Sequence, residues 1–293
     1  MKRSRVLVKN LTVIETLSCV NVIASDKTGT LTQNKMFVAS AAAGVEKLDL
    51  DQAAGQNYDR TVSFNQLVTS CGLCNNASFE DNDTSIPIRQ RKAKGDATDI
   101  AIFKFSSEFQ NINDINTAYD VRAEIPFNSK NKWMVKVIRP KDHEIHRQIF
   151  GVDDDMSADI VLLKGAPDYL VKKSTHVLLE DGSMTPIKPS IANNLIQIQN
   201  DWCVLGQRVL IICKKKCNLD EVMPKDAPVS DLEKYVHQSN DFCIIGLVGI
   251  IDPPREGIAD VLAKCRQAGI RVLMVTGDYA LTAAAIAVQI GNI

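Results

Sequence analysis

The stretch Val20-Asn-Val-Ile-Ala-Ser-Asp26-Lys-Thr-Gly-Thr30 decides how this chain is expected to fold. Residues Val20–Ser25 form a short β-rich run, and the glycine and hydroxylated residues that follow Asp26 stop a strand. Asp26 is therefore expected at the carboxyl end of a strand, where a tight loop begins.

A second stretch, near the other end of the sequence, also has the pattern of a strand followed by a polar loop. Ile270–Val275 is an apolar run of strand length, the loop Thr276-Gly277-Asp278 follows it, and the alanine-rich Ala280–Ile290 is typical of a helix. Ligands bind outside the carboxyl ends of the strands of an open parallel sheet. Asp26 and the loop Thr276-Gly277-Asp278 are therefore expected to share one crevice.

The sequence between these two stretches has a different texture. Alternating strand patterns such as Lys132–Ile138, and polar loops such as 111–116, indicate a mixed α+β domain. We therefore expect one α/β domain, formed by residues 1–36 and 250–293, that is interrupted by an inserted domain over residues 37–249.

The composition excludes several classes of protein. The 34 Lys and Arg residues against 35 Asp and Glu give a net charge of −1, which excludes nucleic-acid binding through bulk positive charge. The longest apolar run, Phe242–Ile251, is well short of the roughly 20 residues that a membrane-spanning helix needs. The basic start Met1–Arg5 leads into no long apolar core, so we expect no secretory signal.

Eight cysteines raise the question of disulfides or zinc. Cys71 and Cys74 form one C-x-x-C pair, but a structural zinc site needs a second pair or two histidines at suitable spacing. We interpret the cysteines as reduced, mostly buried, small hydrophobic residues of a cytosolic region.

The residues after the first strand fit nucleophilic attack on phosphorus. A carboxylate is ordinarily ionised at neutral pH, so Asp26 is the expected nucleophile and would form an aspartyl phosphate. Lys27 would supply positive charge, Gly29 would let the backbone approach the phosphate, and Thr28 would offer hydroxyl and backbone contacts. Because Thr28 cannot activate water as an acid would, the intermediate is expected to persist. The alternative is an ordinary strand-end turn with an exposed aspartate.

The segment Ser25–Met36, with the sequence SDKTGTLTQNKM, resembles the phosphorylation motif of the P-type cation-transporting ATPases. Residues around it look most like the sodium/potassium and proton/potassium pump branch, with the calcium pumps as the nearest rival. The resemblance implies an α/β fold in which an incomplete HAD-like (Rossmann-type) phosphorylation domain is interrupted by a large inserted α+β nucleotide-binding domain. Further segments similar to family signatures follow in the family's order: Lys94–Asp99, Ile125–Lys132, Lys164–Pro167, Leu205–Val209, Asp252–Arg255 and Met274–Asp278.

The resemblance implies an adenine pocket in the inserted domain. Phe127 would stack on the base, Lys164 would lie against adenine and ribose, and Arg208 would contact the phosphate or ribose side of the nucleotide. Ser129 and Lys132 would complete the Phe127 segment. From the residues alone, Phe127 also fits ordinary core packing, and Lys164 also fits a solvated turn.

Asp99 admits two interpretations. It lies where the family carries a glutamate that contacts the adenine amino group, so the resemblance implies a nucleotide contact. With Asp96 as the N-cap, Asp99 would also be the third residue of a helix, where an acid interacts favourably with the helix dipole.

On the phosphate side, the resemblance implies that the loop Thr276-Gly277-Asp278 binds the γ-phosphate at a helix N-terminus. Mg²⁺ would be held by Asp26 and by the Thr28 carbonyl, and would neutralise phosphate charge. ATP and Mg²⁺ are therefore the expected substrate and cofactor.

The expected function is that of the cytoplasmic ATP-binding and phosphorylation region of an enzyme that couples ATP hydrolysis to cation transport across a membrane. The cations would be of the Na⁺/K⁺ type, or H⁺, and an accessory subunit is a candidate partner. The family's later Gly-Asp-Gly-x-Asn-Asp motif and membrane helices do not occur in this sequence, so we expect an internal fragment that turns over poorly alone, from a protein of the plasma membrane. The alternatives are a truncated nucleotide-binding or regulatory module without turnover, and a soluble phosphatase with the same nucleophile.

Overall fold

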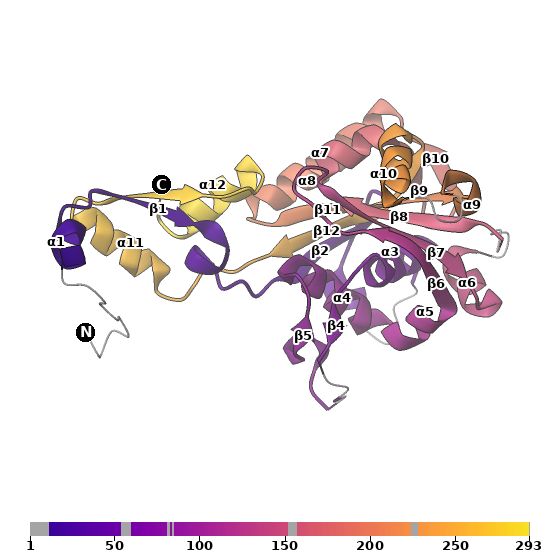
Figure 1. The fold of residues 1–293 in the computed structure, drawn as a ribbon, viewed down its shortest axis with the longest axis horizontal. Helices are drawn as coiled ribbons and strands as arrows, with labels where there is room; N and C mark the ends of the chain where they lie inside the picture. Colours follow the sequence, from indigo (N-terminus) through magenta and orange to yellow (C-terminus); the bar gives the residue numbers. More distant parts are fainter. Residues whose placement is uncertain are drawn as a thin grey trace. The chain divides into compact units, whose positions relative to one another are not determined.

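The computed structural model describes residues 12–53, 60–80, 83, 85–151, 157–223 and 228–292. The chain divides into two compact units, at Asn34/Lys35 and at Ile251/Asp252 (Figure 1). The first unit combines segments from both ends of the sequence, and the second is one continuous segment. The basic start of the sequence, where no secretory signal is expected, lies outside the described residues.

The first unit is built around two parallel strands. β1 pairs with β13 so that Asp26 lies opposite Val275, and both strands therefore end at the same edge. A small apolar core joins the helices to this pair and comprises Leu31, Leu262, Ile286 and Ile290. The elements of the first unit are α1 (Thr12–Ser18), β1 (Val22–Asp26), the helical turn η2 (Lys27–Leu31), α11 (Ile258–Gln267), β13 (Arg271–Val275) and α12 (Ala280–Gln289).

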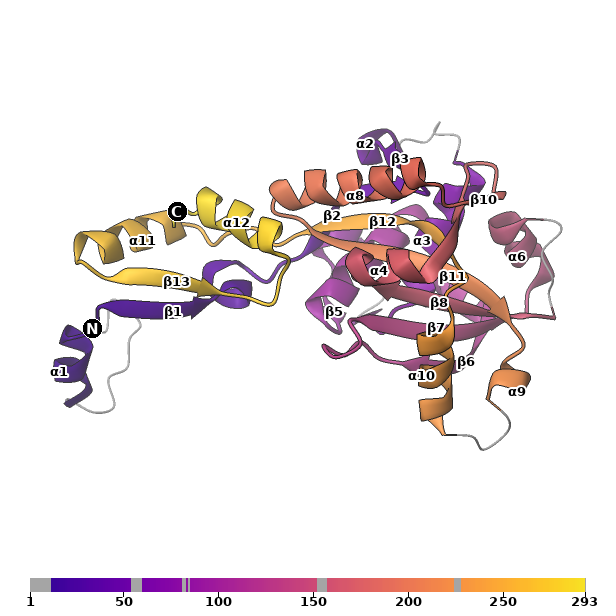
Figure 2. The ribbon, with the colours of Figure 1, turned by 90° about the horizontal axis from the view of Figure 1, so that it is seen from above.

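The second unit contains a nine-stranded sheet (Figure 2). Seven of its strands follow the order β10-β9-β12-β11-β8-β7-β6, and β2 pairs with both β12 and β3. All of these pairs are antiparallel except that of β9 with β12. The strands are β2 (Phe37–Ala43), β3 (Glu46–Leu48), β6 (Tyr119–Ile125), β7 (Trp133–Pro140), β8 (Asp159–Gly165), β9 (Ser174–Leu178), β10 (Met184–Pro186), β11 (Arg208–Cys217) and β12 (Phe242–Ile251), with β4 (Ser78–Phe79) and β5 (Ala93–Lys94) paired separately.

Helices cover both faces of the large sheet (Figure 2). One buried cluster joins the sheet to α3 and α4, and a second joins the opposite face to α8 and α10. Leu162 and Leu163 of β8 enter different clusters because side chains alternate across a sheet, which is why β8 is buried throughout. The helices are α2 (Leu50–Ala53), α3 (Val62–Leu73), α4 (Ala97–Phe109), α5 (Ile112–Ala118), α6 (His143–Phe150), α7 (Pro167–Leu170), α8 (Pro189–Val204), α9 (Leu219–Val222) and α10 (Val229–Gln238), with short 3-10 turns η3 (Ile88–Gln90) and η4 (Val171–Lys173).

The second unit is thus a mixed α/β fold with a large, mainly antiparallel sheet, which agrees with the texture of the middle of the sequence. It extends beyond residue 249, because β12 continues to Ile251 and Ile251 still pairs with Phe37 of β2. No helix in the described part of the chain is both long and apolar enough to span a membrane.

The eight cysteines are free thiols, and most of them are buried. The buried ones are Cys71, Cys74, Cys203, Cys213 and Cys243. This confirms their interpretation as mostly buried small hydrophobic residues.

Burial predicts a large difference in reactivity between these thiols. It raises the pKa of Cys71 and of Cys213 to about 12, so almost none of either side chain is thiolate at pH 8. Alkylation of the folded chain with iodoacetamide at pH 8 is expected to modify the exposed Cys19 and to leave Cys71 and Cys213 unmodified until denaturant is added. Peptide mass spectrometry measures labelling at each position. Equal labelling of Cys19 and Cys213 in the folded chain would contradict the prediction.

Candidate functional site

Asp26 is the last residue of β1, as the sequence predicts, and it is exposed. The chain then turns through η2, in which Thr28 is extended and Gly29 has a φ of +76°. Because a positive φ of this kind favours glycine, Gly29 permits the turn that follows the proposed nucleophile. The Asp26 carboxylate is therefore accessible at the start of a sharply turned segment.

The turn after Asp26 is held by the segment Asp252–Arg255 of the same unit. The Thr32 hydroxyl donates to the buried Asp252 carboxylate at 2.5 Å. The Arg255 guanidinium donates to the Gly29 carbonyl at 2.5 Å, and the Arg255 N–H donates to the Leu31 carbonyl at 3.0 Å. The sequence of Asp252–Arg255 resembles a family signature but does not predict these contacts, which fix the conformation of the turn.

Strand pairing brings the second predicted stretch to the same edge of the sheet. The Lys27 ammonium forms an ion pair with the Asp278 carboxylate, and both side chains are buried. The Asp278 N–H donates to the Thr276 hydroxyl at 3.2 Å, and a Cβ on Gly277 would meet no atom within 4 Å. The loop Thr276-Gly277-Asp278 therefore adjoins the turn after Asp26, and the positive charge of Lys27 faces Asp278.

This edge of the first unit offers oxygen ligands suited to Mg²⁺. Asp26 provides an exposed carboxylate, and Thr28 provides a backbone carbonyl on an extended residue. Mg²⁺ usually binds one or two protein carboxylates and completes its shell with water and substrate phosphate. The two groups therefore fit an ion shared with a phosphate, and the described residues contain no cluster of three His, Cys, Asp or Glu side chains placed to hold a metal without one.

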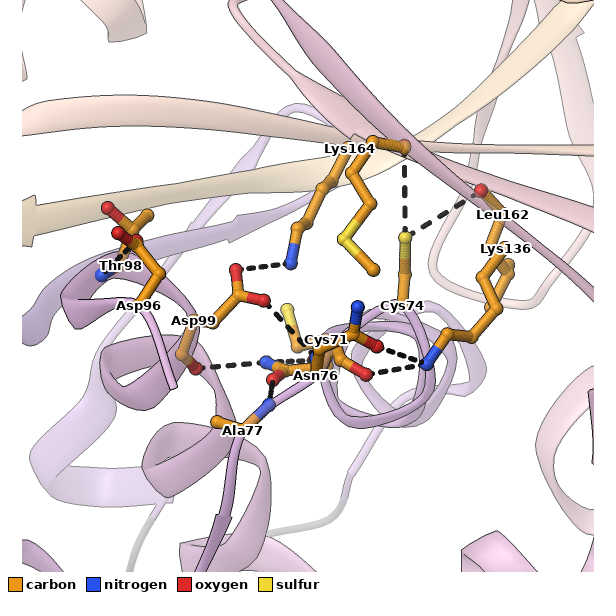
Figure 3. A network of polar contacts seen from close by, with 12 residues as sticks. Cys71, Cys74, Asn76, Ala77, Asp96, Thr98, Asp99, Lys136, Leu162 and Lys164 are labelled. Carbon is orange, nitrogen blue, oxygen red and sulfur yellow. Dashed lines mark hydrogen bonds and ion pairs between the residues drawn. The ribbon is translucent and has the colours of Figure 1, made fainter. Parts of the chain in front are cut away.

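In the second unit, three of the residues predicted from the sequence to bind nucleotide lie in the first turn of α4 or contact it. Lys164 of β8 is 3% exposed, so its interpretation as a solvated turn residue is wrong, and its ammonium lies 2.6 Å from Oδ1 of Asp99 (Figure 3). Asp99 is the third residue of α4, and the N-cap Asp96 accepts from the Thr98 N–H, as predicted. Arg208, the first residue of β11, donates to the Thr98 hydroxyl at 3.1 Å.

A polar network, part of it buried, continues from Asp99 to Asn76 and Lys136 (Figure 3). The Asn76 N–H donates to Oδ2 of Asp99 at 3.2 Å. Lys136 of β7 is buried and donates to the Asn75 carbonyl at 2.6 Å and to the Asn76 side-chain oxygen at 2.9 Å. These residues were not predicted from the sequence. A lysine inside the alternating pattern of a core strand is a usable signal for such a network, because a buried charge needs partners.

Phe127, Ser129 and Lys132 lie on the turn between β6 and β7. Phe127 is 58% exposed, so the interpretation as a core residue is wrong and its ring is free to stack. Ser129 and Lys132 are exposed as well. The Lys132 carbonyl accepts from the Ala166 N–H at 3.2 Å, and a Cβ on Gly165 would lie 2.5 Å from that carbonyl. Only glycine allows this close approach, and the hydrogen bond from Ala166 holds the turn against the end of β8.

The second unit thus combines a buried lysine and a half-buried arginine, both bonded to the start of α4, with an exposed aromatic residue on the turn between β6 and β7. The chain belongs to the family described as P-type ATPase, cytoplasmic domain N, whose model matches residues 63–257. This confirms the resemblance that the motifs indicate.

The similar proteins are ion-transporting ATPases. The chain is 35% identical over 301 residues to the potassium-transporting ATPase alpha chain 2 of Rattus norvegicus. It is 36% and 34% identical, over 301 and 298 residues, to the sodium/potassium-transporting ATPase alpha subunits of Tetronarce californica and Hydra vulgaris. These alignments cover 100% of this chain but 27 to 28% of each relative, so the chain spans about a quarter of their length.

Proposed function

We propose that this chain is the ATP-binding and phosphorylation region of a longer cation-transporting ATPase of the sodium/potassium kind. The observation that carries the proposal is the convergence of Lys164 and Arg208 on one turn of α4, in a domain of the P-type ATPase family. Two cations that bond to consecutive residues of one helix suit a ligand with several negative charges.

The nucleotide contacts follow from the exposure and charge of these side chains. The exposed ring of Phe127 would stack on adenine, while Lys164 would lie against the base and ribose. Arg208 would contact the phosphate or ribose side, and the exposed Ser129 and Lys132 would add polar contacts from the Phe127 turn. The role of Asp99 is considered in the next subsection.

The chemistry proposed for the first unit is phosphoryl transfer to Asp26. A carboxylate oxygen of Asp26 would form a bond to the γ-phosphorus as the bond to the leaving ADP breaks, giving an aspartyl phosphate. The loop Thr276-Gly277-Asp278 would contact the phosphate, and Lys27 would lower the negative charge at this edge through its contact with Asp278. Mg²⁺ bound by Asp26 and the Thr28 carbonyl would neutralise phosphate charge. Since Thr28 cannot act as a base, the aspartyl phosphate would be long-lived.

In the longer protein, the first unit would be part of a HAD-like phosphorylation domain interrupted by the second unit. The aspartyl phosphate would drive transport of cations, with Na⁺, K⁺ or H⁺ as candidates, across the plasma membrane. The region described here would lie on the cytoplasmic side, and an accessory subunit is a candidate partner. Support comes from the family match and from the ion-transporting relatives.

Calorimetric titration of the 293-residue chain with ATP tests nucleotide binding. The Phe127→Ala and Lys164→Met variants are each expected to weaken binding by roughly tenfold, because stacking on an aromatic ring and a hydrogen bond to a charged group each contribute on the order of 1–3 kcal/mol. Met184→Ala is the matched control, since Met184 is as exposed as Phe127 but lies on β10, away from the cluster. A wild-type chain that does not bind ATP would contradict the proposal.

A further inference from the structure

The carboxylate of Asp99 is already engaged on both oxygens. Oδ1 accepts from the Lys164 ammonium at 2.6 Å, and Oδ2 accepts from the Asn76 N–H at 3.2 Å (Figure 3). The side chains of Asp99 and Lys164 are only 13% and 4% exposed. A ligand that drew the Asp99 carboxylate toward itself would therefore weaken a short ion pair that is largely shielded from water.

The backbone of Asp99 is held as firmly as its side chain. Its carbonyl accepts from the Asn75 side-chain amide at 2.9 Å, and Asp96 caps the helix that Asp99 enters. The neighbouring Thr98 accepts from Arg208 at 3.1 Å. Two consecutive residues of α4 therefore accept hydrogen bonds from the two cations that the proposed function assigns to the nucleotide.

A buried lysine without a counter-ion is unfavourable, and a long flexible side chain loses its orientation when its partner is removed. Asp99 supplies the counter-ion and fixes the direction of the Lys164 ammonium at the same time. An aspartate also reaches less far than the glutamate expected from the family resemblance, so it stays close to the helix terminus.

We propose that Asp99 is a positioning residue that holds the Lys164 ammonium for the nucleotide, and that it does not read the amino group of the base. This inference rests on the proposed function, because it assumes that Lys164 contacts a nucleotide. It predicts that losing the charge of Asp99 weakens binding of any purine triphosphate, whether or not the base carries the amino group.

The test compares ATP with purine riboside triphosphate, which lacks the 6-amino group, by calorimetric titration of the full chain. Asp99→Asn keeps the size of the side chain and removes its charge, and it is expected to weaken binding of both nucleotides by the same factor of about ten. Asp99→Glu keeps a carboxylate at this position, so the affinities for both nucleotides are expected to stay within about threefold of wild type. Asp96→Asn is the matched control, because it removes a charge from the same helix terminus and asparagine remains a good N-cap.

A double substitution separates positioning from general damage to α4. If Asp99 acts through Lys164, then Asp99→Asn adds less than about twofold in a Lys164→Met background, because the positioned group is already absent. The inference would be overturned if the effects of Asp99→Asn and Lys164→Met on affinity multiplied in the double variant. It would also be overturned if Asp99→Asn weakened binding of ATP but not of purine riboside triphosphate, or if Asp99→Asn bound both nucleotides like wild type. A wild-type chain that binds neither nucleotide would instead overturn the proposed function on which the inference rests.

Discussion

Replacing Asp26 with asparagine in the longer protein is expected to abolish covalent labelling from ATP that carries a labelled γ-phosphate, by roughly a thousandfold or more. An amide oxygen is a much weaker nucleophile than a carboxylate, so the acyl phosphate cannot form at a useful rate. Within the described residues, the Asp26 side chain makes no hydrogen bond or ion pair, and Asp26 is exposed. The substitution should therefore change the free energy of unfolding by less than about 0.5 kcal/mol.

The measurement is acid quenching after brief incubation with labelled ATP and Mg²⁺, followed by hydroxylamine, which cleaves acyl phosphates. Asp260→Asn serves as the control, because Asp260 is an exposed aspartate of α11 in the same unit and its substitution should leave the label intact. Hydroxylamine-sensitive label that persists in Asp26→Asn would show that another residue is the nucleophile. ATP binding to the second unit should be the same in both variants.

Several local features of the two units could be predicted from the sequence because each depends on neighbouring residues. The end of β1 at Asp26 follows from an apolar run that meets glycine and hydroxylated residues, and the N-cap at Asp96 follows from a short polar residue before a helical pattern. The approach of Asp26 to the loop after Val275 follows from the rule that parallel strands end at one edge.

The ion pair between Lys164 and Asp99 could not be predicted in the same way. The order of the strands and the packing of α4 on one face of the sheet bring the two residues together. Neither the strand order nor the helix packing can be read from the residues next to Lys164 in the sequence. A lysine after a strand is usually solvated, and Lys164 departs from this pattern because Asp99 neutralises its charge. Lys136 shows the same limit, because its partners Asn75 and Asn76 follow α3, which is far from Lys136 in the sequence.

The largest effect on stability is expected from Arg139→Leu. Arg139 of β7 donates from Nε and Nη2 to the two oxygens of Asp159, at 2.9 and 2.6 Å, and the Leu219 N–H donates to Asp159 at 3.0 Å. Asp159 is completely buried, whereas the Arg139 side chain is 29% exposed. The hydrogen bond with Asp159 also raises the pKa of Arg139. Removing Arg139 therefore leaves a buried carboxylate without its counter-ion.

Breaking a buried ion pair on one side typically costs about 3–5 kcal/mol, mostly because the remaining charge is left uncompensated. We expect Arg139→Leu to lower the free energy of unfolding of the chain by about 3 kcal/mol, measured by urea denaturation. Arg122→Leu is the matched control: Arg122 pairs with the exposed Asp220, and exposed pairs contribute roughly 0–1 kcal/mol. The double variant Arg139→Leu/Asp159→Asn should recover much of the loss, because the orphaned charge is gone. Equal losses for Arg139→Leu and Arg122→Leu would show that the charge of Asp159 is compensated by groups other than Arg139.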